Sequence, residues 1–254
     1  MGPEVNKEIP KWLQHRSRGM LHNLGHAVQT PCNNPNMLVL ASASPRRREL
    51  LAQAGFSFQV YPAHIPEDPN PNEDPIAYVI RLAREKAQAV FDQLSGAPGS
   101  GSSRTGLRPW GGDLDSETWE SANLDRHSLV VLGADTTVTL DSRILGKPED
   151  SADAARMLRL LSGRTHRVIT GVAVITAERT EVAAEVTAVK FLALSEQDIA
   201  AYIATGEAMD KAGAYAIQGR AARWIPRIEG DYFNVVGLPL ALVSTLLDSL
   251  KTTR

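Results

Sequence analysis

Short apolar stretches alternate in this sequence with stretches of helical period, and this alternation limits most strongly which folds the chain can adopt. The longest helical stretch covers 75–94, where Ile76, Ile80, Ala83 and Ala87 recur every three or four positions. Helices are predicted at 45–54, 75–94, 151–161, 195–205 and 239–250. Strands are predicted at 37–41, 56–61, 129–140, 166–176, 181–194, 214–219 and 224–228. Strands and helices mixed in this order indicate an α/β or α+β domain.

The predicted domain covers 37–250 and is accompanied by two polar regions. Residues 1–36 contain Pro31 and Pro35 and show only a faint amphipathic pattern, which indicates a flexible N-terminal extension. Residues 95–128 contain six Gly and seven Ser and almost no periodic apolar residues. This composition predicts a flexible insert within the domain.

The charge balance excludes some classes of partner. The chain has 27 Lys and Arg against 29 Asp and Glu, a net charge of -2, so no overall field draws it to nucleic acid or to an acidic membrane. Any anion site must therefore be local. The single cysteine, Cys32, excludes an internal disulfide and is typical of a reducing compartment. No apolar run approaches the roughly 18 residues that cross a bilayer, and the N-terminus lacks the apolar centre of a secretory signal. We therefore expect a cytoplasmic protein.

The segment Ser42-Ala43-Ser44-Pro45-Arg46-Arg47-Arg48 joins a strand to a helix. Hydroxyl groups stand at the expected cap, and Pro45 suits the first helical position. The free amides of the first turn and the positive end of the helix dipole would then face the same place as Arg46, which describes an anion site. Arg47 and Arg48 are expected to face solvent. An ordinary capped helix with solvated arginines explains this segment, taken alone, equally well.

Two carboxylates are candidates for catalysis and metal binding. Asp135 is expected just after a buried strand that is interrupted at Gly133-Ala134-Asp135, where a carboxylate is costly unless it binds a metal ion, a proton or a base. An Asp in a simple turn is the alternative. One carboxylate holds a hard divalent ion poorly, and Glu67, in a Pro-rich loop, is the candidate for the second.

Lys86, Lys147 and Gln218 complete the candidates found from local patterns. Lys147 follows a tight turn, and Lys86 stands at the edge of the apolar face of the long helix, although lysines are commonly solvated. Gln218 ends the small-residue segment 206–219, where an amide could read the edge of a planar base. A buried Gln that satisfies backbone groups is the alternative.

Several ordered motifs closely resemble the Maf family of nucleoside triphosphate pyrophosphatases. They are Leu40-Ala41-Ser42-Ala43-Ser44-Pro45-Arg46-Arg47, Arg84-Glu85-Lys86-Ala87, Gly133-Ala134-Asp135-Thr136, Leu145-Gly146-Lys147-Pro148, Leu161-Ser162-Gly163, Asp210-Lys211-Ala212-Gly213-Ala214-Tyr215 and Asn234-Val235-Val236-Gly237-Leu238-Pro239-Leu240. The likeness spans about 37–248 and is broken only by the insert. It implies a mixed sheet flanked by helices, in the two-lobed fold shared with inosine triphosphate pyrophosphatases, with the nucleotide in a central cleft.

The resemblance also implies a reaction and a role for each candidate. The reaction is hydrolysis between the α and β phosphates of a nucleoside triphosphate, with Mg²⁺ or Mn²⁺ as cofactor. By resemblance Asp135 is the proton acceptor that activates water and also lies near the ion, which Glu67 assists. Ser42, Arg46, Lys86 and Lys147 would contact phosphates. A homodimer is implied by the resemblance alone.

The same motifs carry an expectation about the base. Arg46, Thr136 and Gln218 match the positions tied to base choice, and the sequence is similar to the branch that acts on dTTP and UTP, whereas another branch prefers 7-methylguanosine triphosphate. Modified pyrimidine triphosphates are included in this expectation. The alternatives are a non-catalytic nucleotide-binding regulator of cell division and a related enzyme that prefers another base.

Overall fold

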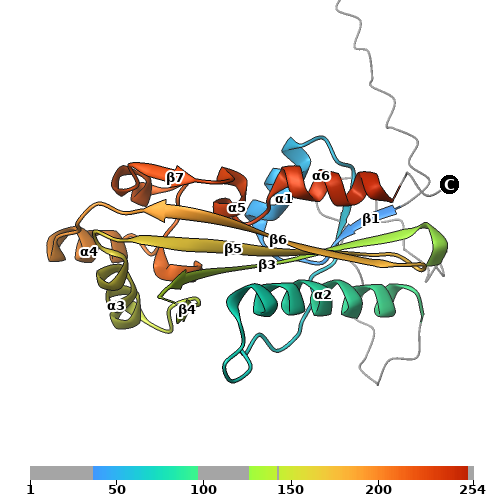
Figure 1. Cartoon of the computed structure of the whole chain (residues 1–254), viewed down its shortest axis with the longest axis horizontal. Helices are drawn as coiled ribbons and strands as arrows, with labels where there is room; N and C mark the ends of the chain where they lie inside the picture. The colour runs from blue at the N-terminus through green and yellow to red at the C-terminus, as the bar shows by residue number, and fades with distance from the viewer. Residues whose placement is uncertain (1–36, 97–125, 142, 251–254) are drawn as a thin grey trace, which may run out of the picture. The chain divides into compact units, whose positions relative to one another are not determined.

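The computed structural model describes residues 37–96, 126–141 and 143–250 (Figure 1). The predicted extension at 1–36 and residues 97–125 of the predicted insert lie outside the described residues. Among the described helices, none combines the length and the apolar character needed to span a bilayer.

The described strands form one mixed sheet, as the resemblance implies. The strands are β1 (Met37–Leu40), β2 (Gln59–Val60), β3 (Leu129–Leu140), β4 (Arg143–Leu145), β5 (Thr165–Ile175), β6 (Thr180–Lys190) and β7 (Arg227–Glu229). Their order is β2-β1-β3-β5-β6-β7, with β4 also paired to β3. The β1 strand is parallel to β2 and β3, whereas β3, β5, β6 and β7 pair antiparallel.

Helices cover both faces of this sheet. They are α1 (Pro45–Gln53), α2 (Pro75–Leu94), α3 (Ser151–Leu161), α4 (Glu196–Ile203), α5 (Tyr232–Val236) and α6 (Leu240–Ser249). Figure 1 shows α2 along one face and α1, α5 and α6 on the other. Both faces of β3 are therefore covered, which explains why nearly every one of its residues is buried.

Local sequence signals explain where the helices begin. Asp74 caps α2 by accepting from the amides of Ile76 and Ala77, and Pro75 follows at the first position. Ser195 and Asp198 form a capping box at the start of α4. The apolar face of α2 is buried against the sheet, so its predicted bounds, 75–94, match those observed.

Two glycines let α2 approach the sheet closely. A Cβ atom on Gly133 of β3 would lie 2.2 Å from the carbonyl oxygen of Ala83. One on Gly171 of β5 would lie 2.3 Å from the carbonyl oxygen of Val79. Only residues without a side chain fit here. The consequence is that side chains in the middle of α2 reach β3 directly.

Five predicted strands need correction. The segment Gly133-Ala134-Asp135 does not interrupt β3, because Gly133 makes the close contact to α2 while the pairing with β5 continues through it. The second strand is only Gln59–Val60, and the strand predicted at 181–194 ends at Lys190. Residues 214–219 form no strand, because positive φ angles at Gly213 (70°) and Ala214 (60°) turn the chain where the predicted strand would begin. Only Arg227–Glu229 of the last predicted region pairs, after a short 3-10 helix, Arg220–Trp224.

The outer edge of β3 is open in its middle. On this side β3 pairs with β1 at residues 129–132 and with β4 at 138–140. Among the described strands, none pairs with 133–137 on this side. Asp135, in the middle of this stretch, is therefore inside a strand yet beside an opening of the sheet, rather than after a strand as predicted.

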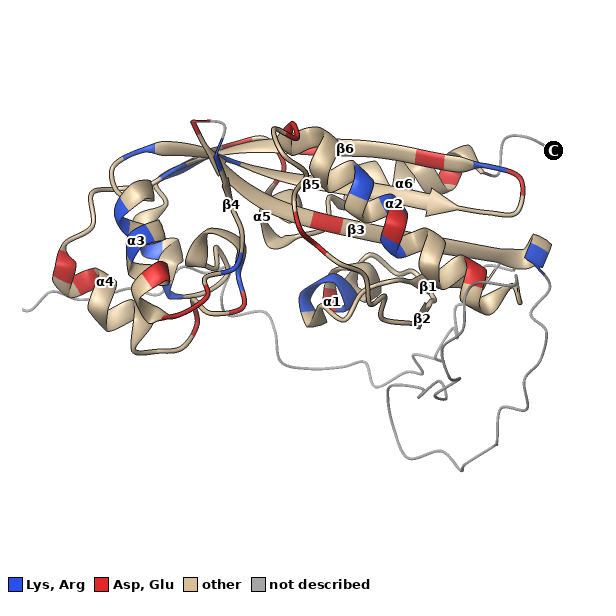
Figure 2. Cartoon of the chain, turned by 90° about the horizontal axis from the view of Figure 1, so that it is seen from below, with Lys and Arg blue, Asp and Glu red and all other residues tan. Residues whose placement is uncertain are grey.

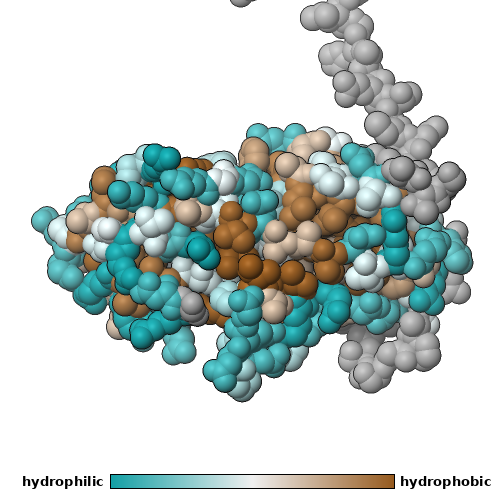
Figure 3. Space-filling view, in the orientation of Figure 1, coloured by the Kyte–Doolittle hydropathy of each residue, from teal (hydrophilic) through white to brown (hydrophobic). Residues whose placement is uncertain are grey.

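A second open edge lies on β6. It pairs with β7 only at Ala188, Val189 and Lys190, so within the described part of the chain no strand covers the outer edge of 180–187. Val182, on this stretch, is 41% exposed. Figure 3, which has the orientation of Figure 1, shows apolar side chains gathered in the middle of the face toward the viewer, over β6 and beside α5 and α6.

Candidate active site

A cavity of about 570 Å³ opens at the gap in the outer edge of β3. It brings together every residue that the sequence predicts for the site. These are Ser42, Arg46, Glu67, Lys86, Asp135, Thr136, Lys147 and Gln218. Residues from both faces of the sheet reach the cavity because, in the part of the chain that the structure describes, no strand closes the gap between β1 and β4. Figure 2 marks the charged positions on the ribbons of α1, α2 and β3.

The start of α1 forms one wall. Ser44 stands at the N-cap, but its side chain makes no capping hydrogen bond, and Pro45 follows at the first helical position. The amide of Ser44 donates to Oγ of Ser42 at 3.2 Å. Because no side chain caps the first turn, the amides of this turn remain suited to an anion.

Arg47, not predicted for the site, is central to it. Its Nε donates to the carbonyl oxygen of Gly237 at 2.8 Å. Its Nη1 donates to the carbonyl oxygen of Ala134 at 2.9 Å and to Oγ of Ser42 at 3.2 Å, and its Nη2 donates to Oγ1 of Thr136 at 2.9 Å. Burial lowers the pKa of Arg47, while the carboxylates of Asp135 and Glu67 act in the opposite direction.

The expectation that Arg47 faces solvent is therefore wrong, and helical spacing explains why. Arg47 precedes the buried residues Leu50 and Leu51 by three and four positions, so all three share the inner face of α1. This spacing is visible in the sequence and could have identified Arg47. Arg46 also lines the cavity, as predicted, whereas Arg48 is partly buried outside its lining.

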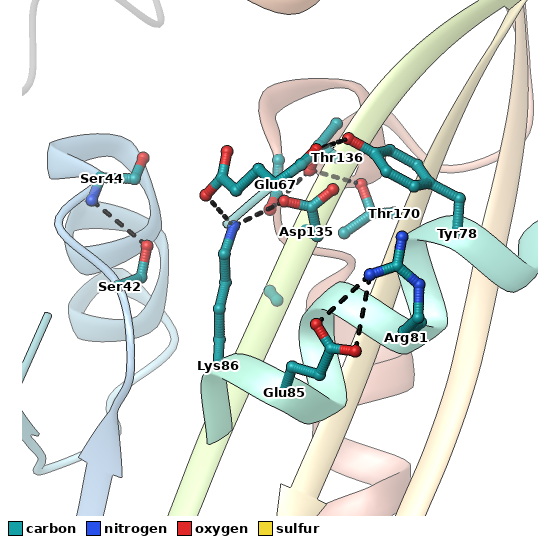
Figure 4. A network of polar contacts seen from close by, with 12 residues as sticks. Ser42, Ser44, Glu67, Tyr78, Arg81, Glu85, Lys86, Asp135, Thr136 and Thr170 are labelled. Carbon is teal, nitrogen blue, oxygen red and sulfur yellow. Dashed lines mark hydrogen bonds and ion pairs between the residues drawn. The ribbon is translucent and has the colours of Figure 1, made fainter. Parts of the chain in front are cut away.

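Lys86 connects the two predicted carboxylates. Its Nζ lies 2.6 Å from Oε1 of Glu67 and 2.7 Å from Oδ1 of Asp135 (Figure 4). Lys86 and Asp135 are each only 7% exposed. Burial favours a higher pKa for Glu67, but the hydrogen bond and charge of Lys86, with the charges of Lys147 and Arg47, lower its pKa below the usual value. The ion pairs therefore keep Glu67 ionised in this partly buried setting.

The loop that carries Glu67 is fastened to α2. The hydroxyl of Tyr78 donates to the carbonyl oxygen of Glu67 at 2.7 Å. Arg81 pairs with Glu73 at 2.6 Å and donates to the carbonyl oxygen of Asp68 at 3.1 Å. Figure 4 shows Tyr78, Arg81 and Lys86 all projecting from α2. These supporting residues were not predicted, because a fastening of this kind depends on how a loop folds back on its helix.

Part of the cavity lining is apolar, and we call this part the apolar end. It includes Val138, Val168, Tyr215, Val235 and Val236. Gln218 lines the same cavity and is exposed, so the alternative of a buried Gln that satisfies backbone groups is wrong. The hydroxyl of Thr136, which accepts from Arg47, also lies 3.0 Å from Oγ1 of Thr170.

The two carboxylates suit a metal ion that arrives with phosphates. Among the described residues, no group of three or more His, Cys, Asp or Glu is placed to hold a metal ion. Mg²⁺ commonly uses only one or two protein carboxylates together with substrate phosphates and water. Glu67 and Asp135, brought within reach of the same ammonium group, provide such a pair. The donor set therefore fits a hard divalent ion.

The arrangement combines charge neutralisation with a possible proton acceptor. Arg46, Arg47, Lys86 and Lys147 surround one cavity, and the free amides of α1 face it. Such a wall suits a highly charged anion such as a polyphosphate. Asp135 provides a buried carboxylate beside that anion.

Comparison with known proteins gives the relationship. The family model described as Maf-like protein matches residues 37–250. A dTTP/UTP pyrophosphatase of Koribacter versatilis is 47% identical over 210 residues, which cover 83% of this chain and 92% of the relative. The enzyme of the same name from Moorella thermoacetica is 49% identical, with coverages of 83% and 93%. That from Bacillus pumilus is 42% identical, with coverages of 86% and 98%. The chain thus belongs to the Maf-like protein family.

Proposed function

We propose that this chain is a nucleoside triphosphate pyrophosphatase that hydrolyses dTTP and UTP to the monophosphate and pyrophosphate. The observation that carries the proposal is the buried Asp135, which faces a cavity lined by arginines and lysines at an opening of the sheet. Relatives over 40% identical that bear the name dTTP/UTP pyrophosphatase support the choice of substrate.

Phosphate binding falls to the cationic wall. The first-turn amides of α1 and the side chains of Ser42 and Arg46 bind phosphate oxygens from one side of the cavity, and Lys147 binds them from the other. Lys86 adds its charge beside the carboxylates. Neutralising the triphosphate is the first requirement, because an anionic phosphate otherwise repels an attacking nucleophile.

Asp135 then acts as the general base. Its Oδ1 is bound by Lys86, and no partner of Oδ2 is found among the described residues, so Oδ2 is the oxygen we assign to the water. The water oxygen bonds to the α phosphorus, its proton passes to Asp135, and the bond from the α phosphorus to the bridging oxygen breaks to release pyrophosphate. Glu67 and Asp135 would hold Mg²⁺ or Mn²⁺, which supplies further neutralisation of phosphate charge.

Base choice is assigned to the apolar end of the cavity. Gln218 offers both a donor and an acceptor there, which matches the polar edge of uracil or thymine. Arg46 and Thr136, the other two residues assigned to base choice, line the same cavity. Modified pyrimidine triphosphates that keep this edge are included in the proposal.

A panel of triphosphates tests the proposal. The purified chain is incubated with dTTP, UTP, CTP, GTP, 7-methylguanosine triphosphate and inosine triphosphate with Mg²⁺ or Mn²⁺, and the products are identified. We expect monophosphate and pyrophosphate, fastest from dTTP and UTP. Asp135→Asn should lower this rate by about 10²–10⁴, the usual contribution of a general base. Full activity in that variant would refute the assignment of Asp135.

The panel also separates the alternatives. Nucleotide binding without turnover would indicate a non-catalytic regulator of cell division. Preference for another base would indicate a different specificity within the family. Stepwise release of single phosphates would contradict the proposed bond cleavage.

We propose in addition a cytoplasmic homodimer without nucleic acid as a partner. The open outer edge of β6 and the exposed Val182 support the dimer, because an unpaired strand can pair with the same strand of a second copy about a two-fold axis.

A further inference from the structure

A buried histidine stands behind the apolar end of the cavity. His166, on β5, is 2% exposed, and its Nε2 lies 2.8 Å from the hydroxyl oxygen of Tyr215. Tyr215 is 5% exposed and lines the cavity. Phe191 packs edge-on against both rings, with centroid distances of 5.1 Å and 4.8 Å. The ring of Tyr215 is thus held from behind by two other rings.

The hydrogen bond is the one polar contact of the buried imidazole within the described part of the chain. No partner is found there for Nδ1 of His166. Burial lowers the pKa of His166 to about 4 and raises the pKa of Tyr215, so both side chains are neutral near pH 7. Loss of the bond would leave a buried polar ring without any partner, which strongly favours the observed pairing.

Tyr215 follows a strained turn. Gly213 and Ala214 have φ angles of 70° and 60°, and Ala214 is fully buried. A left-handed conformation is unfavourable for alanine and persists only where the surroundings enforce it. A Cβ atom on Gly213 would lie 2.9 Å from a methyl group of Val138, so the turn also packs tightly on β3.

Within the described residues, three hydrogen bonds join segment 211–218 to parts of the chain more than ten residues away. The amide of Gly213 donates to the carbonyl oxygen of Gly146 at 3.0 Å. The amide of Ala216 donates to the hydroxyl of Tyr202 at 3.0 Å. The Tyr215–His166 bond is the third, and among the bonds of the described residues it is the one that ties a side chain of the segment to the central sheet. Gln218 follows three residues after Tyr215.

We propose that His166 is a positioning residue for base recognition. Through its hydrogen bond to Tyr215 it keeps segment 211–218 in the shape that forms the apolar wall and presents Gln218 to a pyrimidine. The inference rests on the proposed function, because it assumes that the base of a nucleoside triphosphate occupies this end of the cavity. His166 itself does not touch the substrate.

Four variants test this role. Tyr215→Phe and His166→Phe remove the hydrogen bond, and the first changes almost no volume. His166→Gln retains a side chain that can bond to Tyr215. Tyr232→Phe removes the hydroxyl of an exposed tyrosine (40%) and serves as the control. The readouts are kcat and KM for UTP, the inhibition constant of inorganic triphosphate, which lacks a base, and the thermal midpoint of each variant.

Tyr215→Phe and His166→Phe should each raise KM for UTP about tenfold, the effect of one buried hydrogen bond, with kcat within about twofold. The inhibition constant of inorganic triphosphate should stay unchanged. The double variant that combines Tyr215→Phe with His166→Phe should have a KM for UTP no higher than that of either single variant. His166→Gln should have a KM between those of the wild-type chain and His166→Phe.

Two results would overturn the role of His166. One is an unchanged KM for UTP in a folded Tyr215→Phe variant. The other is an equal rise in KM for UTP and in the inhibition constant of inorganic triphosphate, which would indicate a purely structural effect. If the wild-type chain fails to hydrolyse UTP, the proposed function is refuted, and calorimetric binding of UTP and inorganic triphosphate to the same variants decides the role of His166 separately.

Discussion

At the scale of single residues, Arg47 joins three parts of the fold that line the cavity. Its guanidinium group binds Ser42 in the segment before α1, Ala134 and Thr136 on β3, and Gly237, the residue that follows α5. A planar fork with five N–H donors can serve acceptors in several directions at once, which an ammonium group on a flexible chain cannot do.

We therefore predict different results for lysine at two adjacent positions. Arg47→Lys should lower the free energy of unfolding by about 3 kcal/mol, because it leaves buried acceptors unpaired, and should also lower kcat/KM. Arg46→Lys should lower kcat/KM with little change in stability. Urea unfolding and pyrophosphate release measure the two effects. Equal stability losses in both variants would contradict the central role of Arg47.

His166 should make stability depend on pH. Its pKa in the folded protein, about 4, lies below the usual value of 6.5 because of burial. Between these values the unfolded chain binds a proton that the folded chain does not, so stability falls as the pH falls below 6.5. The loss from pH 7 to pH 5 should be about 2 kcal/mol. In His166→Phe the same urea titrations should show a pH dependence that is smaller by this amount.

The candidate residues differ in how far the sequence could identify them. Asp135 is recognisable because a carboxylate within an apolar strand is costly, and Ser42 because it precedes a helix that begins with Pro45. The hydrogen bond of His166 to Tyr215 joins residues 49 positions apart and depends on a turn with positive φ at Ala214. No local pattern reports such a contact.

At the scale of elements, the packing of α2 on the sheet sets the geometry of the carboxylate pair. Lys86 reaches Asp135 because Gly133 and Gly171 allow the backbone of α2 to lie directly against β3 and β5. The position of a whole helix thus controls a distance of 2.7 Å in the site.

Gly133→Ala should therefore disturb both the fold and the reaction. The new Cβ atom would lie 2.2 Å from a backbone oxygen of α2, so the helix must shift, at a cost of about 1–3 kcal/mol or more. We expect a lower thermal midpoint and a lower kcat. Gly146→Ala is the control, since a Cβ atom there meets nothing within 4 Å. Normal kcat in Gly133→Ala would show that the contact of Lys86 with Asp135 tolerates movement of α2.

The elements also differ in how well the sequence predicts them. The α2 helix begins at a cap and a proline and buries a regular apolar face, so local signals suffice to predict both of its ends. The region 214–219 has the composition of a strand, but the turn at Gly213 and Ala214, where the strand would begin, prevents it from pairing. The short strands β2 and β7 depend on neighbours far along the chain, which a local pattern cannot indicate.

At the scale of the whole molecule, the open edge of β6 makes assembly testable. Light scattering should report a dimer for the wild-type chain, and Val182→Lys should shift it toward the monomer, because a lysine on an edge strand opposes pairing. Leu192→Lys, at an exposed leucine (48%) outside β6, is the control. A monomeric wild-type chain, or equal effects of the two substitutions, would contradict a dimer through this edge.

Because of the gap between β1 and β4, hydrogen exchange of β3 should depend on whether a nucleotide is bound in the cavity. The carbonyl oxygens of Leu132 and Ala134 accept from Ala41 and Arg47 on the gap side of β3, so the amides of Ala134 and Thr136 point to that side as well. No strand among the described residues shields them. Their hydrogens should exchange with deuterium far faster than those of the amides facing β5, and a bound nucleotide should slow this exchange. Mass spectrometry of one peptide from β3 would thus follow occupancy of the cleft without a label.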